Sequence, residues 1–121
     1  MSDESQNLQP NVSAPQFNQP SNITFRAFQK LILEMYGRKD FERGVDGTFM
    51  WLIEEVGELA TALKSGTKDE LAAEFADVIA WLTTIANISG IDLTEALAAK
   101  YGSGCPGCGN YVCSCPDAEK P

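Results

Sequence analysis

Apolar residues recur at every third or fourth position along much of the chain from residue 24 onward, which is the spacing of amphipathic α-helices. The first such run follows Thr24, a residue type favoured at the N-cap of a helix, and it ends at Gly37. The next stretch, "GRKDFERGVDG", combines three glycines with charged residues. This composition predicts a loop over residues 37–47.

Two longer helices and one short helix are predicted after this loop. The longer helices cover residues 48–65 and 67–89, and each stops before a glycine. The second one opens on "TKDE", a capping box, and a similar box, "DLTE", opens the short helix over residues 92–101. No segment alternates apolar and polar residues with period two. The predicted fold class is therefore all-α, a small helical bundle built on an antiparallel hairpin of the two longer helices.

Composition divides the chain into three parts. Residues 1–23 are rich in Ser, Asn, Gln and Pro, which predicts a disordered N-terminal tail. Residues 24–101 form the helical domain, and residues 102–121 form a cysteine-rich tail. Because a helical domain of this size buries a limited share of its surface, we expect a homo-oligomer, a dimer or a tetramer, to complete the bundle.

The chain has a net charge of −8 and contains no histidine. The acidic balance argues against binding to nucleic acid through a basic face. The N-terminal segment lacks the apolar core of a signal peptide, and the apolar runs are shorter than a membrane span needs, so we expect a cytoplasmic protein without membrane contact. The missing histidine excludes Ser-His-Asp and Cys-His catalysis, and it weakens the case for a di-metal carboxylate oxidase.

Acidic residues stand beside the apolar stripe of both longer helices. At about 100° per residue, Glu55 and Glu58 lie next to the stripe of the first helix, and Glu74 and Asp77 lie next to that of the second. Antiparallel packing lets the two pairs face each other, and four clustered carboxylates repel unless a cation lies among them. Oxygen ligands without sulfur or imidazole suit Mg²⁺ or Mn²⁺. The alternative is that these acids are the solvated faces of two amphipathic helices.

The tail carries four cysteines in the stretch "CPGCGNYVCSC": Cys105, Cys108, Cys113 and Cys115. Four thiols this close together, in a chain without a predicted secretion signal, favour a structural Zn²⁺ site over disulfides. Redox-active thiols are the second interpretation. The closing C-x-C pair is less usual in zinc sites than a second C-x-x-C.

Two motifs resemble a known enzyme family. "EEVGE" at residues 54–58 and "EFAD" at residues 74–77, with fifteen residues between them, resemble the E-E-x-x-E … E-x-x-D motif of MazG-type nucleotide pyrophosphohydrolases. The segments "DVIAWL", "IANISGIDLTEAL" and "AAKY" resemble the same family, so the likeness covers about residues 24–101. The cysteine-rich tail is a departure from the family's catalytic core.

The resemblance implies an all-α bundle that assembles as a homodimer or a dimer of dimers. It also implies Mg²⁺-dependent cleavage of nucleoside triphosphates to a monophosphate and pyrophosphate. Carried over by position, the metal ligands are Glu55, Glu58, Glu74 and Asp77. In a chain without histidine, Glu54 or Glu55 is the available proton acceptor.

Two further residues are candidates for substrate binding. Lys100 occupies the family's lysine-bearing position and could hold the leaving pyrophosphate, although a solvated lysine is an equal alternative. Trp81, one helical turn after Asp77, could stack on the nucleobase or belong to the core. For Trp51 the bundle core or a subunit interface is the favoured interpretation.

A competing function is a non-catalytic acidic helical interaction module with a zinc-binding tail. Such a module has no need for four carboxylates at matched positions, which favours the hydrolase. The base and sugar of the substrate, and whether it is a canonical or a damaged nucleotide, stay open.

Overall fold

A computed structural model of the protein describes residues 22–117, and most of this range is helical. Helix α1 spans Phe25–Ser65, α2 spans Lys68–Ile88 and α3 spans Leu93–Tyr101. Residues 22–117 contain no strand, so the predicted all-α class is confirmed. The predicted disordered tail over residues 1–23 lies almost wholly outside the described residues.

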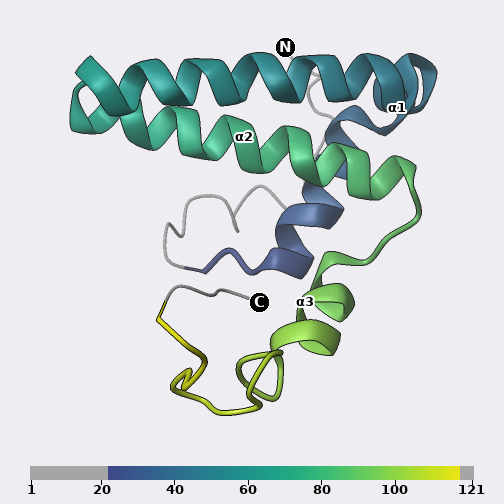
Figure 1. The fold of residues 1–121 in the computed structure, drawn as a ribbon. Helices are drawn as coiled ribbons and strands as arrows, with labels where there is room; N and C mark the ends of the chain where they lie inside the picture. Colours follow the sequence, from purple (N-terminus) through teal and green to yellow (C-terminus); the bar gives the residue numbers. More distant parts are fainter. Residues whose placement is uncertain (1–21, 118–121) are drawn as a thin grey trace.

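Helix α1 is one long helix with a break at Gly44, and the loop predicted over residues 37–47 is therefore wrong. Gly44 has φ 81° and ψ 176°, a backbone conformation that favours glycine, while the residues on either side are helical. The break bends α1, so that its first part runs in a different direction from its second part (Figure 1). The other two glycines of this stretch, Gly37 and Gly47, are accommodated within the helix.

Three of the four predicted helix starts are confirmed at the atomic level, and the start predicted at residue 48 is wrong because Thr48 lies inside α1. Thr24 Oγ1 accepts a hydrogen bond from the backbone amide of Ala27 at 3.0 Å. The capping box of α2 is complete, because Thr67 Oγ1 accepts from the Glu70 amide at 3.1 Å and Glu70 Oε1 accepts from the Thr67 amide at 2.9 Å. Asp92 Oδ1 caps α3 by accepting a hydrogen bond from the Glu95 amide at 3.1 Å.

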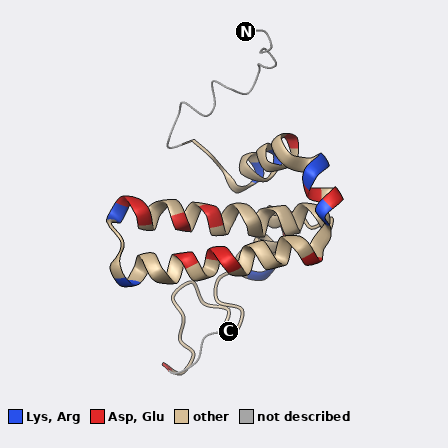
Figure 2. Ribbon diagram, turned by 90° about the horizontal axis from the view of Figure 1, so that it is seen from above, with Lys and Arg blue, Asp and Glu red and all other residues tan. Residues whose placement is uncertain are grey.

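The second part of α1 and the whole of α2 form the predicted antiparallel hairpin, and they lie side by side in both overall views (Figures 1 and 2). Its core is small, and within the described residues the buried apolar side chains are Ile32, Leu52, Ala62 and Ala86. Large apolar side chains of both hairpin helices remain exposed: Phe49, Ile53, Val56, Leu63, Phe75, Ile79 and Leu82. A single chain therefore leaves much of its apolar helix surface uncovered.

Helix α3 is fastened to the start of α1 by one glutamine. Gln29 Nε2 donates to Asn87 Oδ1 at 3.0 Å and to the Ile91 carbonyl at 2.7 Å, and Gln29 Oε1 accepts from the Leu93 amide at 2.9 Å. Arg26 adds an exposed ion pair with Asp92 at 2.8 Å. The short helix thus belongs to the side of the molecule formed by the first part of α1.

Helix α2 meets the length and composition of a membrane-spanning helix, which the sequence pattern did not indicate. An 18-residue window within Lys68–Ile88 has a mean hydropathy of 1.4, and 17% of that window is buried. One such helix is weak evidence for a span. In this chain α2 packs along α1 and carries Glu74 and Asp77, which are costly groups to place in hydrocarbon.

Candidate active site

The hairpin brings three of the four predicted metal-binding carboxylates together. Glu55 and Glu58 come from α1 and Glu74 comes from α2, and each offers a carboxylate oxygen within 4.8 Å of the other two. Acidic segments lie opposite each other on the two helices of the hairpin (Figure 2). The i, i+3 spacing and the antiparallel packing therefore produce the expected cluster.

Two oxygen atoms of this cluster are buried without a partner. Glu55 Oε1 and Glu74 Oε1 are out of contact with solvent, and neither atom has a hydrogen-bond partner among residues 22–117. Burial raises the pKa of both carboxyl groups, and repulsion from Glu58 and Asp77 raises it further. The Trp81 side chain hydrogen-bonds the Glu55 carboxyl group and Glu55 hydrogen-bonds Glu74, and both interactions act to lower the pKa values. Buried carboxylate oxygens without a donor, in a group that repels itself, fit an oxygen-liganded divalent cation.

The remaining predicted residues of the site take different places. Asp77 is exposed and lies outside the group of three, but it is near enough for its charge to raise the pKa of Glu55 and Glu74. Glu54 is exposed and also lies outside that group. Lys100 lies on α3, with its Nζ 5.6 Å from the centroid of the Tyr101 ring. The group of three thus consists of Glu55, Glu58 and Glu74, and Glu54 is not part of it.

An aromatic pair occupies the hairpin one helical turn from the carboxylates. Trp51 and Trp81 stack with ring centroids 5.6 Å apart and planes 9° from parallel. Trp81 is half-buried, whereas Trp51 is 46% exposed. The guanidinium of Arg43 lies 5.0 Å from the Trp81 centroid. Trp81 therefore contacts both Trp51 and Arg43, and Trp51 presents the more accessible ring.

Sequence reasoning missed a buried polar cluster beside this pair. Asp40 is 3% exposed, and its carboxylate accepts from Arg43 Nη1 at 3.0 Å and from Thr84 Oγ1 at 3.2 Å. Arg43 Nη1 also donates to the fully buried Thr48 at 3.1 Å. The loop predicted over residues 37–47 gives no reason to expect a buried ion pair in this segment. The i, i+3 spacing of Asp40 and Arg43 was the available signal.

A surface pocket of about 300 Å³ lies between the start of α1 and the connection from α2 to α3. Arg26, Gln29, Asn87 and Asp92 are among the residues that line it. It shares no residue with the carboxylate group, and several of its side chains serve to fasten α3. The pocket is therefore separate from the candidate site at the hairpin.

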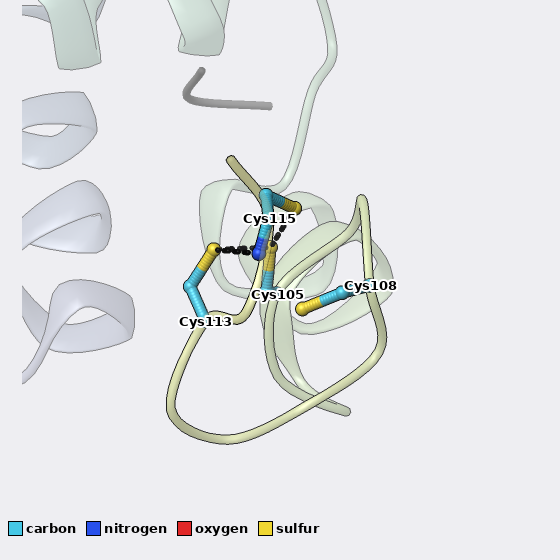
Figure 3. A group of neighbouring side chains, drawn as sticks. All are labelled: Cys105, Cys108, Cys113 and Cys115. Atoms are coloured by element: carbon cyan, nitrogen blue, oxygen red, sulfur yellow. Dashed lines mark hydrogen bonds between the residues drawn. The ribbon is translucent and has the colours of Figure 1, made fainter. Parts of the chain in front are cut away.

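The four cysteines of the tail also converge, and Figure 3 shows their side chains gathered within one loop. All four are free thiols, and their sulfur atoms lie within 4.8 Å of one another. Backbone amides that point at Cys108 lower the pKa of its thiol to about 5. The tail thus contains a second group of metal-ligand type, chemically distinct from the carboxylates.

Comparison with known protein families finds a match that covers the hairpin. A family model described as a MazG nucleotide pyrophosphohydrolase domain matches residues 43–108, which is more than half of the chain. The matched range contains both helices of the hairpin, the tryptophan pair and all the acidic candidates. A search among curated proteins found no match.

Proposed function

The chain belongs to the MazG nucleotide pyrophosphohydrolase family, and from this premise we propose that it is a Mg²⁺-dependent nucleoside triphosphate pyrophosphohydrolase. Family membership supports hydrolysis of a nucleotide. The finer proposal is that water attacks the α-phosphorus, that the bond from this phosphorus to the bridging oxygen breaks, and that pyrophosphate leaves. The observation that carries the proposal is the convergence of Glu55, Glu58 and Glu74 with two buried carboxylate oxygens that lack a donor.

The carboxylates are proposed to hold Mg²⁺ or Mn²⁺ through oxygen ligands, with Asp77 as the fourth acidic residue beside them. When bound, such an ion neutralises the carboxylates, allows a polyanionic substrate to approach and polarises its phosphate. The protein's own contribution is to fix the acids from two helices at one place. Glu55, or the neighbouring Glu54, is the proposed acceptor for the proton released by the attacking water.

The aromatic pair supports a site for the nucleobase. We place the base at the Trp51–Trp81 stack, because stacking on an indole accepts any base and the pair lies one turn from the carboxylates. Trp81 remains the predicted binding residue, and the exposed ring of Trp51 would meet the base alongside it. Lys100 is proposed to reach the pyrophosphate from α3. The alternative of a solvated lysine is consistent with its exposed position.

A homo-oligomer is proposed to cover the apolar surface of the hairpin. Phe75, Ile79 and Leu82 follow one face of α2 and are 48%, 41% and 48% exposed. These three positions suit a helix face that packs against a second copy of the chain. We place the protein in the cytoplasm, where its proposed substrates are found.

A non-catalytic acidic interaction module with a zinc-binding tail is the competing function. It would explain the exposed apolar faces but not the buried, unpartnered oxygens of Glu55 and Glu74. A panel of nucleoside triphosphates with Mg²⁺, scored for pyrophosphate and for orthophosphate, separates the two. Pyrophosphate release supports the hydrolase, and no hydrolysis of any member of the panel supports the module.

We predict a pH-dependent stability difference that reports on the carboxylate cluster. The pKa values of Glu55 and Glu74 are raised above the ordinary 4.5, so the folded protein resists their ionisation. The free energy of unfolding of the metal-free protein should therefore fall as the pH rises through and above 4.5, relative to Glu74→Gln. Thermal melts of both proteins are recorded across this pH range. Subtracting the stability of Glu74→Gln from that of the wild type at each pH removes the contributions of the acids that the two proteins share.

Added Mn²⁺ or Mg²⁺ should reverse this loss, because the ligands bind the metal in their ionised form. The metal-induced rise in Tm should grow with pH in the same window and should be smaller in Glu74→Gln. A rise in Tm that is equal in the two proteins at every pH would show that the ion binds elsewhere.

A further inference from the structure

We propose that Cys105, Cys108, Cys113 and Cys115 bind one Zn²⁺ in a closed structural site, separate from the hydrolytic centre. Nothing in the proposed hydrolysis requires these residues, and the family match ends at residue 108, before the last two of them. The proposal rests on the arrangement of sulfur atoms and on the loop that holds them.

The distances between sulfur atoms fit a tetrahedral thiolate site. Cys105 Sγ lies 3.6 Å from Cys113 Sγ and 3.8 Å from Cys115 Sγ. Four sulfurs placed about 2.3 Å from a central zinc at tetrahedral angles lie about 3.8 Å from one another. A disulfide would require its two sulfurs to lie about 2.05 Å apart. The observed spacing therefore leaves room for an ion between the thiols.

The backbone of the loop is shaped to present these sulfurs. Gly104 has φ 109°, and a Cβ at this position would lie 2.7 Å from the Asn110 carbonyl oxygen. This close approach lets the Cys105 amide donate to the same carbonyl at 2.8 Å, and the Gly109 amide donates to the Cys105 carbonyl at 2.7 Å. The chain is thus folded back so that the C-x-x-C pair faces the C-x-C pair.

Backbone amides also point at two of the sulfurs. The amide of Ser114 donates to Cys108 Sγ at 3.2 Å, and the amide of Cys115 donates to Cys113 Sγ at 3.3 Å. Amide donors of this kind orient metal-binding thiolates and share their negative charge.

The proposed zinc would hold together a loop that has no apolar core of its own. Tyr111 and Val112, its large apolar residues, are 97% and 77% exposed. Four thiolates fill the coordination shell of zinc and leave no position for water or substrate. The ion would therefore order residues 104–115 without taking part in hydrolysis.

We expect about one zinc per chain in the purified full-length protein and none in Cys108→Ser, measured by elemental analysis after dialysis. Ser103→Ala, in the same tail, and Glu58→Gln, in the carboxylate cluster, should both keep their zinc. Co²⁺ added to metal-free, reduced protein should give the intense sulfur-to-cobalt absorption of a tetrahedral thiolate site, and Cys108→Ser should lack it.

Zinc that is retained by Cys108→Ser but lost from Glu58→Gln would place the ion among the carboxylates and overturn the proposal. Reduced protein that takes up neither Zn²⁺ nor Co²⁺ would also overturn it, as would thiols found paired in disulfides by mass. These outcomes do not depend on hydrolysis, so the zinc site and the proposed function can fail separately.

From a separate observation, the buried cluster at the break in α1, we infer that Arg43 is a positioning residue for the aromatic pair. Its Nη1 is held by Asp40, on the same side of Gly44, and by Thr48, on the other side. Asp40 is held in turn by Thr84 of α2. The guanidinium is therefore tied to both parts of α1 and, through Asp40, to the second helix of the hairpin.

This anchored guanidinium lies against Trp81, which stacks on Trp51. A cation fixed over an indole ring favours one orientation of that ring. Trp81 in turn orients Trp51, the more exposed ring, next to the carboxylates. The inference that Arg43 affects nucleotide binding rests on the proposed function, whereas its effect on the stack does not.

The test uses the double variant Asp40→Asn/Arg43→Met, because Arg43→Met alone would leave a buried, unpaired carboxylate and could unfold the protein. The chain has two tryptophans, so the exciton signal of a stacked indole pair in circular dichroism reports on this stack alone. We expect the double variant to lose that signal and to raise KM about tenfold, with kcat much less affected. Arg38→Met, which removes an exposed arginine paired with Glu42, should change neither.

A double variant that keeps both the exciton signal and KM would overturn the inference. If the wild-type protein hydrolyses no nucleotide, the exciton signal still tests whether Arg43 positions the pair. Loss of the signal in Arg38→Met as well would show that the stack is sensitive to any change in this segment, and would equally contradict a specific role for Arg43.

Discussion

Glu58→Gln is expected to lower kcat/KM for nucleoside triphosphate hydrolysis by at least about 100-fold while the helical content stays unchanged. Changing groups that only support a metal ligand typically costs 10- to 100-fold, so changing a ligand should cost at least as much. The substitution keeps the size of the side chain and removes its charge. Steady-state kinetics with Mg²⁺ and far-ultraviolet circular dichroism measure the two effects.

Without metal, the same variant should melt no lower than the wild type. The charge of Glu58 is one cause of the raised pKa of Glu55 and Glu74, so its removal relieves repulsion in the folded state. Glu34→Gln is the matched control, since it removes an exposed acid of α1 that pairs only loosely with Lys30, at 4.0 Å. Full activity in Glu58→Gln, or an equal loss in the control, would remove the carboxylate cluster as the site.

Phe75→Glu is expected to convert the proposed oligomer into monomers at micromolar concentration. A carboxylate buried without a partner in an apolar interface costs several kcal/mol, which raises a dissociation constant by more than tenfold. Phe75 is 48% exposed in the single chain and lies on the apolar face of α2. Sedimentation velocity on wild type and variant measures the change.

Leu97→Glu provides the control for this experiment, because Leu97 is a 40% exposed apolar residue on α3, outside the hairpin. It should leave the assembly intact. A wild-type protein that sediments as a monomer would contradict the proposed oligomer. An oligomer that survives Phe75→Glu would show that another face is covered.

Three helix starts could be predicted from the sequence because local interactions decide them, whereas the start predicted at residue 48 does not exist. Thr24, Thr67 and Asp92 each form their caps with residues three positions away. The course of α1 between residues 37 and 47 could not be predicted in this way. Ion pairs such as Arg38–Glu42 support a helix, and the buried contact of Asp40 with Thr84, 44 residues away, holds it in place. Glycine content indicated only that the chain would break, and the break is confined to Gly44.

The meeting of Glu55 and Glu58 with Glu74 followed from spacing and antiparallel packing, and the structure bears it out. The sequence did not indicate whether each apolar stripe is buried within the chain or left exposed. Helical periodicity puts Phe75 and Leu82 on the apolar stripe predicted for residues 67–89, which is the face expected to form the core, yet both are about half exposed. An apolar face that packs within a chain and one that packs against a second copy have the same pattern. The sequence therefore could not indicate which face each helix turns toward its hairpin partner.

The central claim is that this chain hydrolyses the bond between the α- and β-phosphates. It is tested most directly by incubating the protein, Mg²⁺ and a nucleoside triphosphate in water enriched in oxygen-18, with phosphorus NMR of the products. We predict a nucleoside monophosphate that carries the label and pyrophosphate that does not, with both formed at least about 100-fold more slowly by Glu58→Gln. Orthophosphate together with a nucleoside diphosphate, or label in the pyrophosphate, would contradict the account.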